Sequence, residues 1–383
     1  MQFAFSDEQQ QFRDMVRRFL VETSPTTQTR QLMDTELGFD PEVWGRMSQE
    51  LGLAGLAIPE AHGGAGFGVV ELCIAMEELG RAIACTPYLA TAVLAAKAIE
   101  LVGSSADQAR LLPPIASGQC IATLALTEPS GLPGIEAIEA TAAQSGGAYS
   151  LTGAKKFVID GCNADLLLIA ARTPGSTGSK GVSLFEVAAD APGLQRTALA
   201  VMDPTRKQAQ LQVDSVPATL LGDFEGAAAG LQTTLDLAAI ALANEMVGGA
   251  ERLLEDTVAY TQLRVQFGRT IASFQAIKHR CTEMLLGVEL AKSTAYYAAE
   301  AADAGAPDIA ALASQAKAIA ADTYMQTAIE AIQLHGGIGF TWDNDTHLWF
   351  KRAKSSEVLL GDAAWHRERM IQQTLQHMEA QTA

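Results

Sequence analysis

The sequence predicts an α+β protein that is mostly helical, with a β-domain between two helical parts. Apolar residues recur at helical spacing over residues 1–120, and again from residue 223 to the C-terminus. Between these parts the period changes to short segments rich in β-forming residues, each bounded by Gly, Pro, Asp or Ser. We therefore predict an N-terminal helical domain (1–120), a small β-barrel or β-sandwich (121–222) and a C-terminal four-helix bundle (223–383).

The N-terminal part carries several helix signals. Ser6 precedes acidic residues and an apolar run at helical spacing, so we expect it to be an N-cap. The Asp40-Pro41 pair starts another helix, with Pro at the first helical position. Residues 69–84 and 88–102 are apolar nearly all round, which predicts two buried helices. The glycine-rich stretch 59–68 is expected to be a tight interhelical turn that lies near the functional site.

Strands and long helices are expected in the remaining two parts. Six short segments between residues 121 and 220 predict strands, and the Gly/Ser-rich stretch 172–180 predicts a flexible surface loop. After residue 226 the helical period returns, and long helices with short connections predict a bundle. These helices are expected over residues 231–265, 270–304, 309–334, 342–360 and 362–378.

Composition excludes several classes of protein. The net charge of −17 argues against nucleic acid or an anionic membrane as the main partner, because both are bound by clustered Lys and Arg. No apolar run is long enough to span a membrane, and the N-terminus lacks the basic and apolar regions of a signal peptide, so we expect a cytoplasmic protein. The five cysteines are scattered and lack C-x-x-C spacing, so we expect neither disulfides nor a metal site.

Two segments about seventy residues apart combine the residue types that bind a phosphorylated ring compound. The first, RVQFGRTIASFQAIKHR, contains a guanidinium, an aromatic ring and an amide in Arg264, Phe267 and Gln275. The second, QLHGGIGF, ends an apolar helix in a glycine run that begins at Gly336. Glycines let backbone N–H groups approach a phosphate, and arginine is a permanently charged planar donor. Taken alone, the glycine run would be a helix C-cap and turn.

In this order and spacing, the two segments resemble those of the acyl-CoA dehydrogenase family. The resemblance extends to PEAHGGAGFG (59–68), LTEP (126–129) and SLTGAKKFVIDG (150–161), and so covers essentially the whole chain. It implies that the two segments of one subunit bind the adenosine and pyrophosphate of an FAD whose ring lies in the neighbouring subunit. By motif match the adenosine–pyrophosphate half would be held by Arg264, Phe267, Gln275, Gln333, Gly336 and Gly337, and the flavin ring would be lined by Leu124, Leu126, Thr127, Phe157 and Ile159.

The chain departs from the family pattern on the substrate side. Where the family has W-I-T/S, this sequence has Phe157-Val158-Ile159, so Ile159 replaces the hydroxyl expected near the flavin. Pro133 replaces the serine that contacts the thioester end of CoA, and proline also lacks an N–H. Both changes affect the thioester more than the flavin.

Neither of the positions at which the family places its catalytic base holds a carboxylate. Alignment on Gly361 places Leu360 at the C-terminal position, and counting back along the long helix places Ala238 at the other. Two substitutes are candidates for the base, Glu245 and Asp362. A lone Glu in an apolar helix is either paired at an interface or functional, and we favour the interface. Asp362 is expected to be the N-cap of the final helix.

The leading hypothesis is an oxidoreductase that carries out FAD-dependent α,β-dehydrogenation of an acyl-CoA thioester, with electron-transfer flavoprotein as its expected redox partner. The motifs most resemble subunits of heterotetrameric bacterial enzymes that act on bulky thioesters such as steroid side chains. We therefore expect a homo-oligomer, or a heterotetramer with a glutamate-bearing paralogue. Two alternatives stay open: an FAD-binding partner subunit without its own base, and a different reaction on the same scaffold, such as desulfination.

Overall fold

The computed structural model describes the backbone of residues 5–382 and the side chains of residues 5–375. Internal contacts divide the chain into two compact units. The first combines the N-terminal residues up to Gln31 with Val69–Ala84 and the chain from Ala239 onward, and the second combines Leu32–Gly68 with Cys85–Ala238. We call them the bundle unit and the barrel unit and describe each by itself. The three-part division at residues 120 and 222 matches the changes in secondary structure and stays a prediction as a division into domains.

The expected helical start of the chain is confirmed. Ser6 accepts a hydrogen bond from Gln9 N, and Gln9 returns one from its side chain to Ser6 N, which is a capping box. Asp40 caps the helix that begins at Pro41. The helices are α1 (Asp7–Thr23), α2 (Thr26–Leu32), α3 (Pro41–Gln49), α4 (Val69–Arg81), a π-helix (Leu89–Ala95) that continues into α5 (Ala96–Val102), and α6 (Ser105–Ala116).

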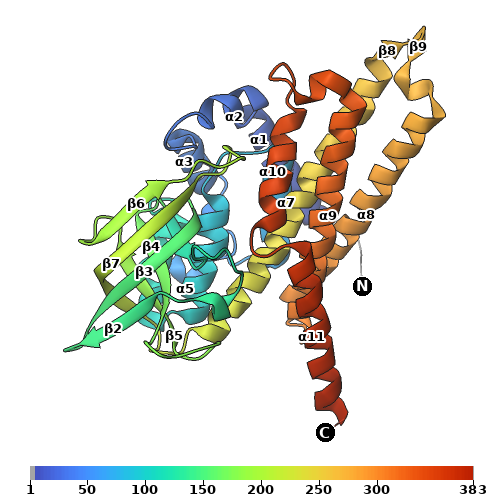
Figure 1. Ribbon diagram of the computed structural model, residues 1–383. Helices are drawn as coiled ribbons and strands as arrows, with labels where there is room; N and C mark the ends of the chain where they lie inside the picture. The colour runs from blue at the N-terminus through green and yellow to red at the C-terminus, as the bar shows by residue number, and fades with distance from the viewer. Residues whose placement is uncertain (1–4, 383) are drawn as a thin grey trace. The chain divides into compact units, whose positions relative to one another are not determined.

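The expected β-domain is a small closed barrel within the barrel unit (Figure 1). Strand β4 pairs with β2 on one side and with β5 on the other, and the order β4-β2-β3-β7-β5 therefore returns to β4. Alternating apolar residues such as Leu167, Phe185 and Val216 fill its core. The strands are β1 (Ala122–Ala125), β2 (Thr141–Ser145), β3 (Ala148–Ile159), β4 (Leu166–Arg172), β5 (Val182–Ala188), β6 (Leu194–Ala198) and β7 (Gln208–Leu221).

The C-terminal helices run side by side in the bundle unit, and α9 packs against α8, α10 and α11 (Figure 1). A short hairpin connects α7 to α8, and a 3₁₀ turn over Gly336–Phe340 follows α9. The elements are α7 (Ala228–Leu263), β8 (Val265–Gln266), β9 (Arg269–Thr270), α8 (Gln275–Asp303), α9 (Ile309–His335), α10 (Thr346–Val358) and α11 (Ala363–Thr382).

Two glycines bring α4 and α7 into backbone contact. A methyl group on Gly80 would lie 1.9 Å from the carbonyl oxygen of Glu245, and one on Gly248 would lie 1.9 Å from that of Glu77. No side chain fits at either position, so the two helices can cross only where both carry glycine. This crossing fixes the part of α7 that carries Glu245.

Some observed helices differ from the expected ones at their ends. Helix α8 begins at Gln275 instead of residue 270, because the β8–β9 hairpin and a 3₁₀ turn precede it. Helix α10 begins at Thr346 instead of residue 342, because the 3₁₀ turn and a short loop occupy the residues before it. No described helix is long and apolar enough to cross a membrane. In the described part of the chain no three His, Cys, Asp or Glu side chains are grouped to hold a metal ion, and the five cysteines are free.

Candidate functional site

The hairpin between α7 and α8 exposes an aromatic ring and an arginine at one end of the bundle unit. Phe267 and Gly268 form its two-residue turn with φ angles of 53° and 75°, as in a type I′ turn. Phenylalanine is unusual in this conformation, and the Phe267 side chain is 91% exposed. The exposed Arg264 guanidinium makes no ion pair or hydrogen bond within the described residues. Gln275, also exposed, is the first residue of α8.

A glycine nest follows α9 in the same unit. Gly336 adopts a φ of 67°, and a Cβ added to Gly336 or Gly337 would meet no atom within 4 Å. Both glycines and Gln333 are exposed, so the nest is an open cradle. His335 is buried beside it: its ring stacks on Tyr260 at 4.2 Å, and its Nδ1 lies 2.7 Å from the carbonyl of Ala331. Burial lowers the pKa of His335, which therefore serves as a neutral support.

The LTEP segment lies against strand β3 in the barrel unit. Lys155 Nζ lies 2.7 Å from Glu128 Oε1 and 3.2 Å from the Leu126 carbonyl, and both charged groups are buried. Glu128 also accepts hydrogen bonds from the backbone N–H groups of residues 139 and 140. Burial lowers the pKa of Lys155 to about 8, and the neighbouring carboxylate opposes that change. These bonds fix the segment that carries Thr127.

Of the five residues expected to line the flavin ring, Leu124 lies on β1, Leu126 and Thr127 lie on the LTEP segment, and Phe157 and Ile159 lie on β3. The backbone N–H of Lys156 donates to the carbonyl of Thr127 at 2.8 Å. The register of β3 against β7 shifts between Lys155 and Val158, and Phe157 adopts a φ of 60° within that bulge. Phe157 is thereby turned out to 39% exposure, whereas Leu124, Leu126 and Ile159 are buried and Thr127 is half-buried.

The loop between α10 and α11 carries the position expected for the base. Leu360 has a φ of 61°, and Gly361, with a φ of 102°, packs against Trp365. Asp362 is exposed and accepts a hydrogen bond from Trp365 N at 2.8 Å, so it is the N-cap of α11 as expected. The carbonyl of Leu360 accepts a hydrogen bond from His366 Nε2 at 3.1 Å.

Glu245 lies in a buried ion pair within the chain. Its Oε1 is 2.7 Å from Nη1 of Arg352 on α10, and the side chains are 4% and 3% exposed. The pair joins two helices of the bundle unit, so Glu245 is paired at the contact between α7 and α10. Ala238, at the other expected base position, is fully buried.

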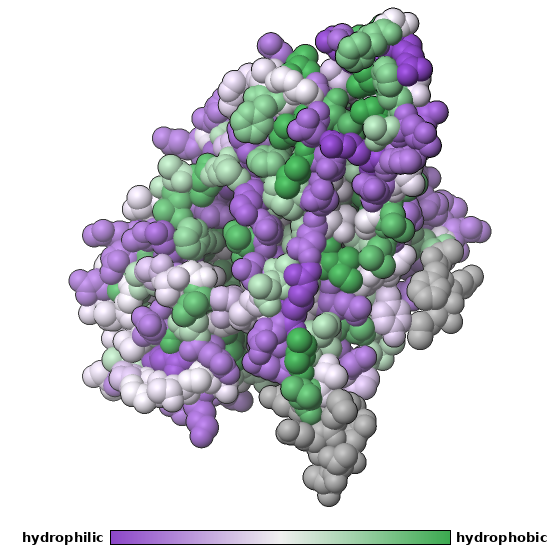
Figure 2. Space-filling view, turned by 45° about the vertical axis from the view of Figure 1, so that its right-hand side comes forward, coloured by the Kyte–Doolittle hydropathy of each residue, from purple (hydrophilic) through white to green (hydrophobic). Residues whose placement is uncertain are grey.

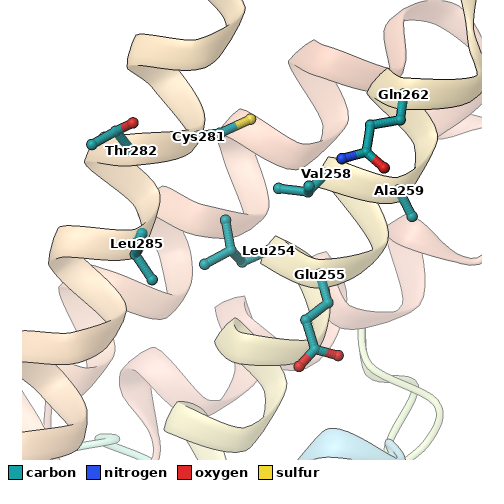
Figure 3. Close-up of a pocket in the computed structure, with 8 residues that line it drawn as sticks. All are labelled: Leu254, Glu255, Val258, Ala259, Gln262, Cys281, Thr282 and Leu285. Carbon is teal, nitrogen blue, oxygen red and sulfur yellow. The ribbon is translucent and has the colours of Figure 1, made fainter. Parts of the chain in front are cut away.

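A groove of about 460 Å³ runs between α7 and α8 (Figure 3). Leu254, Val258 and Leu285 give it apolar walls, and Gln262 and Cys281 line it as well. Gln262 lies two residues before Arg264, so the groove continues toward the hairpin. Figure 2 shows apolar side chains interspersed with polar ones at the end of the molecule that carries the hairpin.

The chemical groups that the described residues expose are of the kinds that bind FAD. The bundle unit offers a free guanidinium, an exposed ring and an open nest, which match a pyrophosphate and an adenine. The barrel unit offers an apolar face with the Thr127 hydroxyl, which has no partner among the described side chains. The sequence analysis missed Lys317 and His366, which support the loop at Leu360. A lone Lys in the Ala-rich stretch of α9 was the available signal.

Comparison with known proteins identifies the family. Residues 6–119 match the acyl-CoA dehydrogenase N-terminal domain, and residues 226–375 match the acyl-CoA dehydrogenase C-terminal domain. Acyl-CoA dehydrogenase IpdE2 of Mycolicibacterium smegmatis is 32% identical over 356 residues, which cover 93% of this chain and 95% of the relative. The chain belongs to the acyl-CoA dehydrogenase family.

Solved structures of acyl-CoA dehydrogenases share its fold throughout. A variant of the Tcur3481–Tcur3483 steroid ACAD has a TM-score of 0.88 and 32% identity, covering 97% of this chain and 99% of the other. The ChsE4–ChsE5 complex from Mycobacterium tuberculosis contains a chain with a TM-score of 0.88 and 30% identity, covering 98% and 99%. This acyl-CoA dehydrogenase is thus a flavoprotein oxidoreductase whose chemistry is FAD-dependent acyl-CoA dehydrogenation.

Replacing Arg264 with Ala should release FAD from the acyl-CoA dehydrogenase before it affects the fold. The guanidinium has no partner in the described chain, so its removal leaves the packing intact but deletes charge-assisted bonds to phosphate. We expect FAD affinity to fall by about 10- to 100-fold, equivalent to one or two such bonds. Fluorescence titration with FAD measures it, with Arg280→Ala on α8 as the control. Equal losses of affinity or of melting temperature in both variants would contradict this role.

Acid should destabilise the protein through His366. Burial lowers the pKa of His366, and the neighbouring cations Lys317 and Arg369 lower it further in the same direction, to about 3. The unfolded chain takes up this proton near pH 6.5 and the folded chain only near pH 3, so stability falls as the pH drops across that window. Between pH 6.5 and 5 this loss is up to about 2 kcal/mol.

Urea unfolding at pH 7 and pH 5 measures the effect. We expect His366→Gln to lose less stability than the wild type over this interval, since glutamine does not titrate. His279→Gln, at an exposed position of α8, is the matched control and should behave like the wild type. An identical pH dependence in all three proteins would show that His366 is not the titrating group.

Proposed function

We propose that this chain is one subunit of a hetero-oligomeric acyl-CoA dehydrogenase that acts on a bulky CoA thioester, and that a second type of subunit supplies the catalytic base. The proposal rests on one observation: neither of the two positions at which the family places its base holds a carboxylate. Ala238 and Leu360 occupy the two family positions, and neither side chain can accept a proton. The reaction needs a base within hydrogen-bond reach of the weakly acidic α-proton.

The two substitute carboxylates are already engaged. A general base must be free to reach the α-proton, whereas the Glu245 carboxylate is held in a buried ion pair with Arg352. Moving Glu245 out of this pair would also take an ion-pair partner from a buried arginine. Asp362 is held at the N-terminus of α11 by its bond to Trp365 N.

The residues that we propose to bind the flavin, by contrast, are all present in this chain. Arg264, Gly336 and Gly337 would hold the pyrophosphate, and Phe267, Gln275 and Gln333 would bind the adenosine. Leu124, Leu126, Thr127, Phe157 and Ile159 would line the flavin ring. Bound FAD would supply the acceptor for the β-hydride of the thioester, and electron-transfer flavoprotein would reoxidise it. A chain that keeps the cofactor residues but lacks the base fits a partner role within an enzyme.

The relatives support both the partner and the type of substrate. One similar structure is described as a steroid ACAD of two named components, and another as a ChsE4–ChsE5 complex. The groove between α7 and α8 lies beside the hairpin that would reach a neighbouring flavin, so a partner at the hairpin would also cover the groove. Leu286 and Leu290, exposed on α8, extend this apolar surface.

The lone FAD-loaded chain should therefore be nearly inert as a dehydrogenase. General-base catalysis is worth about 10²–10⁴-fold, so adding a glutamate-bearing partner should raise the rate by a factor in that range. Flavin bleaching under anaerobic conditions, with straight-chain, branched and steroid-type CoA thioesters, measures the rate.

Two variants identify the base if the lone chain is active. Robust activity of the lone chain that collapses in Glu245→Gln or in Asp362→Asn would overturn the proposal and name the residue. Activity that survives both would show that the base lies elsewhere in this chain. A partner whose own glutamate has been changed to glutamine is the control for the assembled enzyme.

A further inference from the structure

Two buried side chains, one on α9 and one on α11, hold the loop between α10 and α11. Lys317 of α9 donates from Nζ to the carbonyls of Glu357 at 3.2 Å and Gly361 at 3.0 Å. His366 of α11 donates from Nε2 to the carbonyl of Leu360 at 3.1 Å. The two side chains are 0% and 1% exposed. We call Lys317 and His366 the loop clamp.

Carbonyl oxygens at the end of a helix ordinarily bind water or a capping group. Here the amino group of Lys317 takes the place of the water, and its protonated form also complements the negative end of α10. The tautomer of His366 follows from the same geometry: Nε2 must carry the proton, and Nδ1 is buried without a partner. Both donors are therefore committed to the loop.

The loop has a backbone that needs such support. Leu360 is a non-glycine residue at a φ of 61°, which costs about 1–2 kcal/mol. Gly361, at a φ of 102°, lies so close to Trp365 that an added Cβ would be 2.6 Å from its ring. Strain of this kind persists only where surrounding contacts over-determine the conformation, and it concentrates at functional sites.

We propose that Lys317 and His366 are positioning residues that fix the backbone of Leu360, so that the side chain at this position is presented as a base would be. This inference rests on the proposed function, because the role of position 360 comes from its place in the family pattern. The loop would then need only a carboxylate at position 360 to present a base.

The substitution Leu360→Glu tests whether the loop can present a base. The FAD-loaded variant, without a partner, is incubated in D₂O with butyryl-CoA or cyclohexanecarbonyl-CoA, and deuterium at the α-carbon is followed by mass spectrometry. The introduced carboxylate takes the α-proton while the charge moves to the thioester oxygen. The carboxyl group then exchanges with solvent and returns a deuteron, so no oxidant is needed. We expect exchange at least about 100-fold faster than in the wild type and in Leu360→Gln.

Adding a clamp substitution tests the positioning itself. Combined with Leu360→Glu, either Lys317→Met or His366→Leu should lower the maximal exchange rate about 10- to 100-fold and leave the half-saturating thioester concentration within about threefold, because misplacement by about 1 Å has an effect of this size. His366→Gln keeps a donor and should retain the rate. Without the Leu360 change, Lys317→Met and His366→Leu should each speed hydrogen–deuterium exchange of the amides at 359 and 361.

Three results would overturn the inference. They are a folded, flavin-loaded Leu360→Glu protein that exchanges no faster than Leu360→Gln, an exchange rate unchanged by both clamp substitutions, and loop amides that stay equally protected in both single variants. The amide measurement needs no activity and stands if one double variant fails to fold. Failure of the proposed function would show instead as dehydrogenase activity of the lone wild-type chain, which these comparisons between variants do not use.

Discussion

Left-handed backbone at three bulky apolar residues is the constraint on which the site of this protein depends. Phe157, Phe267 and Leu360 all have φ angles between 53° and 61°, a region that side chains with a Cβ enter at a cost of about 1–2 kcal/mol each. Each residue stands at a position that the family pattern assigns to the cofactor or the base. Local hydrogen bonds and turns hold each of these three conformations.

The support differs at each place and is local to its unit. A register shift between β3 and β7, together with the bond from Lys156 N to Thr127 O, holds Phe157. The two-residue turn of the β8–β9 hairpin holds Phe267, with Gly268 as the second left-handed residue. Lys317 and His366 hold Leu360. Lys317 is a buried amine, and so is Lys155, which lies next to the Thr127 segment. Burial lowers the pKa of both side chains, to about 8 for Lys155 and to about 7 for Lys317.

Much of the fold could be predicted from the sequence because its signals are local. The capping residues Ser6 and Asp40, the change of period near residue 121 and the glycine run at Gly336 each mark a boundary that the structure has. The bonds that shape the site could not be predicted, since they join residues far apart in the chain. Lys155 and Glu128 are 27 residues apart, and Glu245 and Arg352 are 107 apart. Periodicity marks a buried charge as exceptional but does not name its partner.

Whether this chain carries a base depends on which residues occupy the family positions and on the contacts that its other carboxylates make with distant residues. Leu360, Ala238 and the capping role of Asp362 could be predicted from the sequence, but only the structure shows that Glu245 is paired with Arg352. We therefore expect the carboxylate that acts as the base to come from a second chain. The most direct measurement is an experimental structure of the assembled enzyme with FAD and a CoA thioester, in which the distance from the thioester α-carbon to the nearest carboxylate is read. We expect that carboxylate to belong to the partner subunit and to lie within about 3–3.5 Å; a carboxylate of this chain at that distance, whether from Glu245, Asp362 or another residue, would contradict the account.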